Sequence, residues 1–489
     1  MATQIQGKLG KATMWSTLTE LSVKLVGPIT NAVLARLLVP ESFGVVASLT
    51  MVVSFAEVFT DAGFQKYLVQ HEFRDDEDLN LSTNVAFWTN LCFSLLFWAA
   101  ISLFAEPIAG WVGSPGCGNA VIVMSLQIPV LAFSSIQMAR FRRDMDFKGL
   151  FVVRVITAFV PLAVTVPLAL FFRSYWALVI GTLSRDILTA LILTCRSHWK
   201  PRFRYCFAKL KDMLSFSLWS LVENVSIWMT NYVGIFIVGL ALTEHYLGLY
   251  RTTIATVNGV LNVIATAFMQ VLFAGLSRCQ DNEEQTRNIF FRFQRILALL
   301  MLPLGCGIYL YRGLATDILL GSQWTETADF LGLWALVSSL TIVFSNVNSE
   351  LYRSKGKPWL SVLSQVLNLV VLIPGLILLM QQGYGALTTF RSLIRLEIIL
   401  VTMTISHLLL GIKVGSVLRN VYPSVVATAV MSLAGWFLQR LWPGIVWQIV
   451  SVGLCVLIYG GCLLLLPEGR RQLLEVPVLG KILKKIGIR

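Results

Sequence analysis

The chain alternates long apolar runs with short polar turns. A helix needs about 20 apolar residues to cross the hydrocarbon core of a bilayer. Pro129, Pro161 and Pro167 interrupt two of the runs, and we read them as kinks, because neighbouring helices tolerate such breaks in membranes. Fourteen runs have the required length, near 14–38, 43–69, 82–105, 119–139, 150–172, 175–195, 214–240, 245–273, 289–311, 327–351, 359–380, 384–410, 421–440 and 444–466. The pattern predicts an all-α polytopic membrane protein with about 14 transmembrane helices.

Two polar segments between long runs resemble each other. Leu34–Gly44 reads LARLLVPESFG, and Ile237–Gly248 reads IVGLALTEHYLG. Each follows an apolar run and holds a Glu, an aromatic residue and a Gly before the next run begins. Pro40 cannot continue the preceding helix, and Gly44 lets the chain turn. We predict that each segment is the tip of the first hairpin in one of two structural repeats.

The segment Arg196–Asp212, RSHWKPRFRYCFAKLKD, separates the first six runs from the next six. Because six is even, both halves enter the membrane from the same side, as parallel repeats do. The segment is basic and aromatic, so we expect it to lie along anionic headgroups, the alternative being a merely solvated connector. The expected organisation is an N-terminal six-helix lobe (1–195), a basic cytoplasmic linker (196–213), a C-terminal six-helix lobe (214–412), helices 13 and 14 (413–466) and a basic cytoplasmic tail (467–489).

Composition agrees with a chain that lies mostly in lipid. Hydrophobic residues make up 56% of it and charged residues only 13%, where a soluble protein has about 25%. The net charge of +13 would suggest nucleic acid in a soluble protein, but membrane proteins collect Lys and Arg in their cytoplasmic loops. With the N-terminus in the cytoplasm, most of the 39 Lys and Arg residues lie on that side. We therefore predict that both termini are cytoplasmic and that no nucleic acid is bound.

Charged residues inside the spans are costly and raise a functional hypothesis. The basic ones are Lys24, Arg154, Arg185, Arg251, Arg391 and Arg395. The acidic ones are Glu20, Glu57, Asp61, Asp186, Glu223 and Glu397, with Glu350 near an inner end. Three pairs have i,i+4 spacing and so share a helix face, which should point toward protein or water: Glu20/Lys24, Glu57/Asp61 and Arg391/Arg395.

The acidic pair Glu57/Asp61 suits ion coupling. Two carboxylates one turn apart raise the pKa of one of them, which fits a proton or Na⁺ site. Pairing with a basic residue of a neighbouring helix, for example Lys24, is the alternative. Glu223 is a further coupling candidate. Lys24 itself either neutralises Glu20 or lines a central cavity.

The basic residues suit an anionic ligand. Arg391 and Arg395 share a face without an acidic residue on it, since Glu397 points elsewhere. Arg251 and Arg154 lie near span ends and could instead extend to the interface, whereas Arg185 lies deeper, beside Asp186. Because both halves supply cations, a cleft between them would accept an acidic amphiphile. We take all six basic residues as substrate-binding candidates.

No catalytic or metal-binding pattern is evident. The four His and eight Cys residues lack metal-ligand spacing, and no GxxxxGK[ST] motif is present. No Ser-His-Asp order stands out either. We therefore expect a protein that is not an enzyme, without catalytic residues, metal or cofactor, and with H⁺ or Na⁺ as the candidate coupling ion.

The ordered motifs resemble the polysaccharide transporter, or Wzx-like flippase, branch of the multidrug/oligosaccharidyl-lipid/polysaccharide exporter superfamily. The resemblance covers roughly residues 8 to 360, and Ala274–Gly275 departs from it where family members commonly carry Pro. The residues that carry it are LARLLVPESFG (Leu34–Gly44), FTDAGF (Phe59–Phe64), LVQ (Leu68–Gln70), FRRDMDFKGL (Phe141–Leu150), LGLYRTT (Leu247–Thr253), VLFAGLSRCQDN (Val271–Asn282), GSQW (Gly321–Trp324) and LYRSKGKP (Leu351–Pro358).

The resemblance implies two six-helix lobes around a central cavity in a bacterial inner (plasma) membrane. It implies movement of an undecaprenyl-pyrophosphate-linked oligosaccharide, a repeat unit of exopolysaccharide, capsule or lipopolysaccharide O-antigen type, by ion-coupled alternating access. Expected partners are that lipid-linked substrate, membrane lipids, and a polysaccharide polymerase with its chain-length machinery.

Two other functions compete with this one. A multidrug antiporter of the same fold would prefer a cavity rich in carboxylates for cationic drugs, whereas the charges inside these spans are not dominated by acid. A membrane glycosyltransferase or polymerase would need a large outer loop or an acidic catalytic motif. The longest outer loops here are short, near 106–118 and 312–326. A flippase therefore remains the preferred interpretation.

Overall fold

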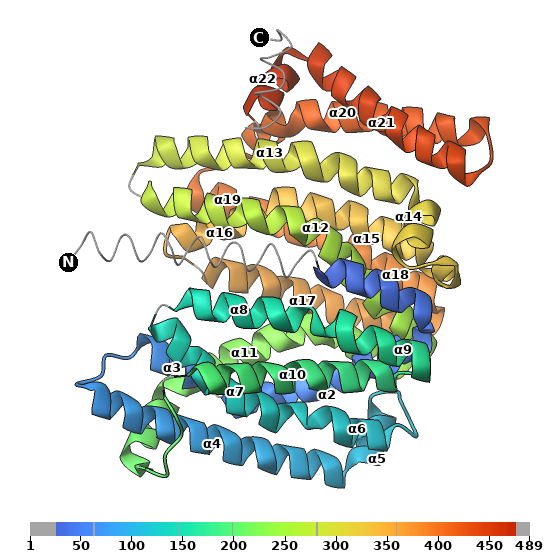
Figure 1. The fold of residues 1–489 in the computed structure, drawn as a ribbon. Helices are drawn as coiled ribbons and strands as arrows, with labels where there is room; N and C mark the ends of the chain where they lie inside the picture. The colour runs from blue at the N-terminus through green and yellow to red at the C-terminus, as the bar shows by residue number, and fades with distance from the viewer. Residues whose placement is uncertain are drawn as a thin grey trace. The chain divides into compact units, whose positions relative to one another are not determined.

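The structure is a computed structural model that describes residues 26–61, 64–144, 146–197, 199–279, 282–357 and 359–475. Every regular element in these ranges is a helix, so the prediction of an all-α protein is confirmed for them (Figure 1). Contacts divide the chain into two compact units, and the boundary along the chain falls between Thr252 and Thr253, inside helix α12. The expected lobes 1–195 and 214–412 were defined by counting predicted spans. The division by contacts does not test them, so they stay a prediction.

The first unit begins, in its described part, with helical residues 26–37. Its elements are α2 (Pro40–Asp61), α3 (Phe64–Gln70), α4 (Asp76–Leu103), α5 (Ala105–Trp111), α6 (Gly118–Ser125), α7 (Gln127–Arg143), α8 (Phe147–Ala158), the π-helical turn η1 (Pro161–Thr165), α9 (Val166–Phe172), α10 (Trp176–Arg196), α11 (Phe207–Ala241) and the start of α12 (Glu244–Arg278).

The second unit contains the rest of α12. Its further elements are α13 (Glu283–Leu310), α14 (Arg312–Leu319), η2 (Ser322–Thr327), α15 (Ala328–Thr341), the π-helical turn η3 (Ile342–Asn346), α16 (Val347–Ser354), α17 (Trp359–Leu379), η4 (Met380–Gln382), α18 (Tyr384–Leu393), α19 (Arg395–Leu410), α20 (Val414–Leu441), α21 (Ile445–Leu465) and α22 (Pro467–Glu475).

Eleven helical segments of the described residues are long and apolar enough to cross a membrane. They correspond to the second to sixth and the ninth to fourteenth expected runs. The seventh and eighth runs lie in α11 and α12, which are 35 residues long each, and most of the first run lies outside the described residues. Fourteen spans and cytoplasmic termini therefore stay predictions.

Prolines interrupt the regular α-helix of one span without ending it. Pro161 opens η1, and the helical path continues through α9, so residues Lys148–Phe172 form one candidate span. Gly181 of α10 packs against this turn, since a Cβ atom there would overlap the hydroxyl of Thr165. The prediction that Pro161 and Pro167 interrupt this span without ending it is thus confirmed.

The first hairpin tip differs from the prediction. The turn is only Leu38–Val39, and Pro40 is the first residue of α2, where its missing N–H costs no hydrogen bond. Glu41 and Gly44 consequently lie in the first turns of the helix. Gly44 is therefore needed for a close helix contact and not for a turn.

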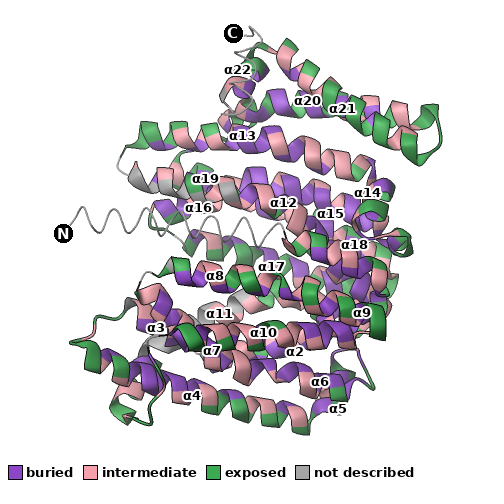
Figure 2. Ribbon diagram, in the orientation of Figure 1, coloured by how far each residue is buried: buried purple, intermediate pink, exposed green. Residues whose placement is uncertain are grey.

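Burial separates two kinds of helix in the second unit. The segment Ser322–Ser354 is largely buried and contains Trp324 and Trp334, whereas α21 has most of its apolar side chains exposed (Figure 2). Exposed apolar side chains also line α20. An apolar exposed helix pair fits contact with lipid, since hydrocarbon satisfies such a surface.

Candidate functional site

The first unit contains a cavity of about 510 Å³. It lies between the helical residues 26–37, α8 with η1, and α10. Two arginines, one amide and four hydroxyl groups face a volume whose other walls are apolar. The lining residues are Gly27, Thr30, Asn31, Leu34, Arg154, Thr157, Ala158, Pro161, Thr165, Leu178, Thr182 and Arg185. A ligand with anionic and hydroxyl groups matches this lining.

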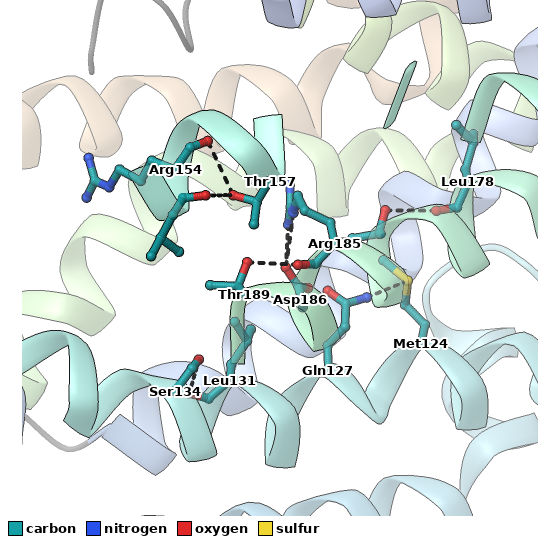
Figure 3. A network of polar contacts seen from close by, with 12 residues as sticks. Met124, Gln127, Leu131, Ser134, Arg154, Thr157, Leu178, Arg185, Asp186 and Thr189 are labelled. Carbon is teal, nitrogen blue, oxygen red and sulfur yellow. Dashed lines mark hydrogen bonds and ion pairs between the residues drawn. The ribbon is translucent and has the colours of Figure 1, made fainter. Parts of the chain in front are cut away.

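Arg154 and Arg185 carry the positive charge of the cavity lining. Arg154 lies on α8 and Arg185 on the neighbouring α10, and both residues are exposed. The Nε and Nη2 atoms of Arg185 each lie 3.0 Å from Oδ1 of Asp186. Figure 3 draws the contact between these two residues. The Arg185 side chain stays 45% exposed while that of Asp186 is 5% exposed. The carboxylate thus holds one edge of the guanidinium, and the remaining N–H groups can serve a ligand.

Threonines complete the polar lining. The hydroxyl of Thr157 donates to the carbonyl of Val153 at 2.9 Å, and that of Thr182 donates to the carbonyl of Leu178 at 2.8 Å. A hydroxyl that donates to its own helix keeps its lone pairs as acceptors, so it can receive a hydrogen bond from a sugar hydroxyl. Sequence reasoning missed these threonines because single Thr residues are common in spans; their recurrence beside Arg154 and Arg185 was the available signal.

A buried polar layer lies behind the arginines. Asp186 and Gln127 are buried, and the amide of Gln127 donates to Sδ of Met124 at 2.8 Å. Further along, the amide of Gln137 donates to the hydroxyl of Thr194 at 2.9 Å. The bond between Gln137 and Thr194 joins α7 to α10 and would be lost if these helices separated, whereas the bond between Gln127 and Met124 is local.

Arg251 lies elsewhere in the first unit. Its guanidinium interacts with the hydroxyl of Tyr232 on α11. The ring of Tyr232 stacks on Trp228 with centroids 5.5 Å apart, and the indole N–H of Trp228 donates to Ser54 of α2 at 3.0 Å. Arg251 is therefore engaged with protein through a chain of contacts that joins three helices.

Arg391 and Arg395 lie in the second unit and share one face. Their guanidinium carbons are 5.1 and 4.4 Å from the centroid of the Trp334 ring, whose indole N–H donates to Asn258 at 3.2 Å. Glu397 points elsewhere and accepts from the amide of Asn368 at 2.9 Å. The common face inferred from the spacing is confirmed, and no local sequence pattern indicates that Trp334 lies beneath it.

Among the acidic coupling candidates, the structure describes the side chain of Glu57. Glu57 is half-buried on α2. The side chains of Asp61 and Glu223 lie outside the described residues, as do Lys24 and Glu20 entirely. Their roles stay predictions. Among the described residues, no group of three or more His, Cys, Asp or Glu side chains is arranged to hold a metal ion.

The fold is similar to that of solved transporters. The inward closed structure of the lipid II flippase MurJ aligns with 92% of this chain and 98% of its own, with a TM-score of 0.75 and 12% identity. An inward-facing multidrug resistance transporter of the MATE family in the MOP superfamily aligns with 79% of this chain and 96% of its own, with a TM-score of 0.58 and 14% identity. At such identities the likeness is one of fold alone, and it defines the class of fold: a helical membrane-protein fold shared with these solved transporters.

The sequence narrows this class to a family. Residues 33–329, more than half of the chain, match the family described as polysaccharide biosynthesis protein, and the chain belongs to that family. The succinoglycan biosynthesis transport protein ExoT of Rhizobium meliloti is 26% identical over 66% of this chain, and the match spans 64% of ExoT. The lipopolysaccharide biosynthesis protein WzxC of Escherichia coli is 20% identical over 74% of this chain and 73% of its own length. The resemblance seen in the motifs is confirmed, and the chain is a multi-pass protein of the inner membrane.

Proposed function

We propose that this protein is a flippase that moves an undecaprenyl-pyrophosphate-linked oligosaccharide from the inner to the outer leaflet of the bacterial inner membrane. The observation that carries the proposal is the 510 Å³ cavity with Arg154 and Arg185 on adjacent helices. The names of ExoT, a transport protein, and MurJ, a lipid II flippase, favour the same reading. It is proposed as a transporter and not as an enzyme.

The lining suits both polar parts of such a substrate. Guanidinium groups pair with phosphate oxygens through two parallel N–H donors, which makes arginine well suited to a pyrophosphate. The amide of Asn31 and the threonine hydroxyls offer donors and acceptors for sugar hydroxyls. Asp186 positions Arg185 and reduces its freedom before the ligand arrives, which lowers the entropic cost of binding.

Alternating access needs an end of the cavity that closes. In the first unit, Gly44 of α2 and Gly248 of α12 meet backbone to backbone, and Nδ1 of His245 lies 2.7 Å from Oε1 of Glu41. The predicted orientation puts this contact at the outer end. We take it as the outer gate, whose opening would release the substrate to the outer leaflet. A gate needs an open and a closed state of similar stability. A contact between two glycines buries no large side chain, so the helix ends can separate at little cost.

Ion coupling is part of the proposal. Glu57, Asp61 and Glu223 are the coupling residues, with H⁺ or Na⁺ as the ion. Entry of the ion would reset the transporter after the substrate leaves. A polysaccharide polymerase with its chain-length machinery would take the product, and membrane lipids surround the protein.

The drug antiporter is the second candidate in the same fold class. Among the described residues lining the cavity, charge comes from two arginines and from no carboxylate. A cationic drug would be repelled by this lining, whereas a pyrophosphate would be attracted. The cavity therefore favours the anionic lipid-linked substrate.

Binding tests the proposal directly. Native mass spectrometry of purified protein with a short polyprenyl-pyrophosphate disaccharide should show one bound ligand. Changing Arg154→Gln and Arg185→Gln together should weaken binding by tenfold or more, since each charge-assisted hydrogen bond contributes about 1.5–3 kcal/mol. Equal binding by this variant, with the fold intact, would remove the cavity from the proposal.

A further inference from the structure

The second unit contains a smaller polar cavity of about 330 Å³ at the start of α20. It lies between α13, α20 and α22. Three arginines and one glutamate face it, so its lining carries more positive than negative charge. The lining residues are Arg295, Ser416, Arg419, Asn420, Glu468, Arg471 and Gln472. None of these residues belongs to the cavity of the first unit.

The floor of this cavity is held by hydrogen bonds within the protein. Gln472 is 4% exposed; its amide donates to the carbonyl of Asn420 at 3.1 Å and accepts from Ser424 at 3.2 Å. The amide of Asn420 donates to the carbonyl of Phe291 at 2.9 Å and to Oε1 of Gln294 at 3.1 Å. The amides thus fix α13, α20 and α22 to one another, and the shape of the cavity is built into the fold.

The charged groups at the mouth have different roles. Arg419 and Arg471 are exposed, so they reach the cavity from solvent without a large desolvation cost. Glu468 interacts with the hydroxyl of Tyr422, which gives the carboxylate a hydrogen-bond partner outside the arginine set. Three guanidinium groups from three helices, offset by one carboxylate, favour a ligand with one or two negative charges.

The surroundings indicate where that ligand comes from. Leu418, Tyr422 and Val425 follow one another at i,i+4 and i,i+3 spacing on α20, and they are 52%, 37% and 45% exposed. An apolar strip beside a basic pocket fits an acyl chain below a headgroup, and pockets of this kind between cytoplasmic helix ends bind anionic lipids. The predicted orientation puts this end of α20 at the cytoplasmic leaflet, where Lys413 precedes it.

We propose that this cavity binds the phosphodiester headgroup of an anionic phospholipid, with an acyl chain along the exposed face of α20. Arg295, Arg419 and Arg471 hold the phosphate, and Ser416 supplies a hydroxyl near it. The volume exceeds that of one phosphate group and leaves room for a glycerol headgroup. A lipid bound here joins α20 and α22 to α13 and stabilises that arrangement. The proposal is independent of the transported substrate.

The experiment uses the full-length protein in a neutral detergent. Native mass spectrometry and thermal unfolding are recorded with phosphatidylglycerol, with phosphatidylcholine and with water-soluble glycerol phosphate. Wild type should retain phosphatidylglycerol and gain thermal stability from it, without either effect from the other two. The double variant Arg419→Gln/Arg471→Gln should bind phosphatidylglycerol about tenfold more weakly, and Arg419→Lys/Arg471→Lys should recover part of the loss.

The matched control is Arg173→Gln/Arg440→Gln, which removes the same charge away from the cavity. It should bind phosphatidylglycerol as wild type does. Equal binding by the control and by Arg419→Gln/Arg471→Gln, both folded, would overturn the site. Equal affinity of wild type for glycerol phosphate would overturn the lipid as occupant and leave a soluble anion. Unfolding temperatures measured in phosphatidylcholine identify any variant that does not fold. If Arg419→Gln/Arg471→Gln does not fold, the affinity of Arg419→Lys/Arg471→Lys for phosphatidylglycerol, compared with that of the control variant, decides whether the site exists.

Discussion

Gly44 and Gly248 touch through their backbones where α2 and α12 begin. A Cβ atom on Gly44 would overlap the carbonyl oxygen of Glu244, and one on Gly248 would overlap the carbonyl oxygen of Pro40. The contact is reciprocal, because each glycine meets the first residue of the other helix. The two hairpin tips that look alike in the sequence thus pack against each other, as corresponding parts of two repeats would.

The first prediction concerns this glycine contact. Gly248→Val should prevent the two helix ends from meeting, since overpacking of a tight contact costs about 1–3 kcal/mol. Cys117 is buried and lies near Glu244, so it reports on opening. In a variant that keeps only this cysteine, an impermeant maleimide should label it about tenfold faster after Gly248→Val. Gly110→Val, where a Cβ meets nothing within 4 Å, is the control and should leave the rate unchanged. Unchanged labelling after Gly248→Val would show that the contact does not close the outer end.

The second prediction concerns Glu41 and His245. Their side chains are 48% and 32% exposed, so the pair should contribute no more than about 1 kcal/mol to closure. It is an ion pair only when the imidazole is protonated, so acidification should slow the labelling of Cys117 beyond the loss that the falling thiolate fraction causes in the unfolded protein. Glu41→Gln should remove this additional slowing and leave the labelling at neutral pH within about fivefold of wild type. Additional slowing that survives Glu41→Gln would assign it to another group.

Sequence reasoning predicted the elements better than their contacts. Apolar runs are a local signal, so eleven of the expected spans appear as helices, and Pro161 does not end its span, as expected. The first turn lies inside the predicted segment Leu34–Gly44, but Gly44 was wrongly assigned to it, because Pro40 can either end one helix or begin the next and the sequence does not distinguish the two. The meeting of Gly44 and Gly248 joins residues about two hundred positions apart, and no local pattern contains it.

For the candidate site, too, the sequence identified single residues better than their contacts. Arg154 and Arg185 were found one by one, because a charged residue inside an apolar run stands out in the sequence. Their place in one cavity depends on how α8 packs on α10, which is a tertiary property. The i,i+4 spacing correctly put Arg391 and Arg395 on one face, while Trp334 beneath them comes from another helix.

The third prediction decides what Arg391 and Arg395 do. If they bind substrate, Arg391→Ala/Arg395→Ala should lower transport well beyond its effect on stability. If they only stack on Trp334, the variant should lose about 1–2 kcal/mol of unfolding free energy and keep its transport rate. Transport per folded molecule and thermal unfolding, measured on the same preparation, separate the two. We expect the loss of transport.

The fourth prediction concerns the interior of the second unit. The hydroxyl of Tyr352 donates to the carbonyl of Thr402 at 2.7 Å and lies 2.9 Å from the hydroxyl of Ser406. Tyr352→Phe should destabilise the protein by about 1–2 kcal/mol, because buried acceptors lose their donor. Tyr309→Phe is the control: that tyrosine is 40% exposed, and its ring still faces Arg312 after the change. Equal unfolding temperatures for both variants would show that the buried hydroxyl contributes nothing.

The central claim is that the cationic cavity carries a pyrophosphate-linked substrate across the membrane. Leaflet transfer of a fluorescent polyprenyl-pyrophosphate oligosaccharide in proteoliposomes tests it most directly. Arg154→Gln/Arg185→Gln is compared with wild type and with Arg173→Gln/Arg440→Gln, which removes equal charge elsewhere. We predict transfer by wild type and by the control, and a loss of tenfold or more in the cavity variant. Transfer at the wild-type rate by a well-folded Arg154→Gln/Arg185→Gln protein would contradict the claim.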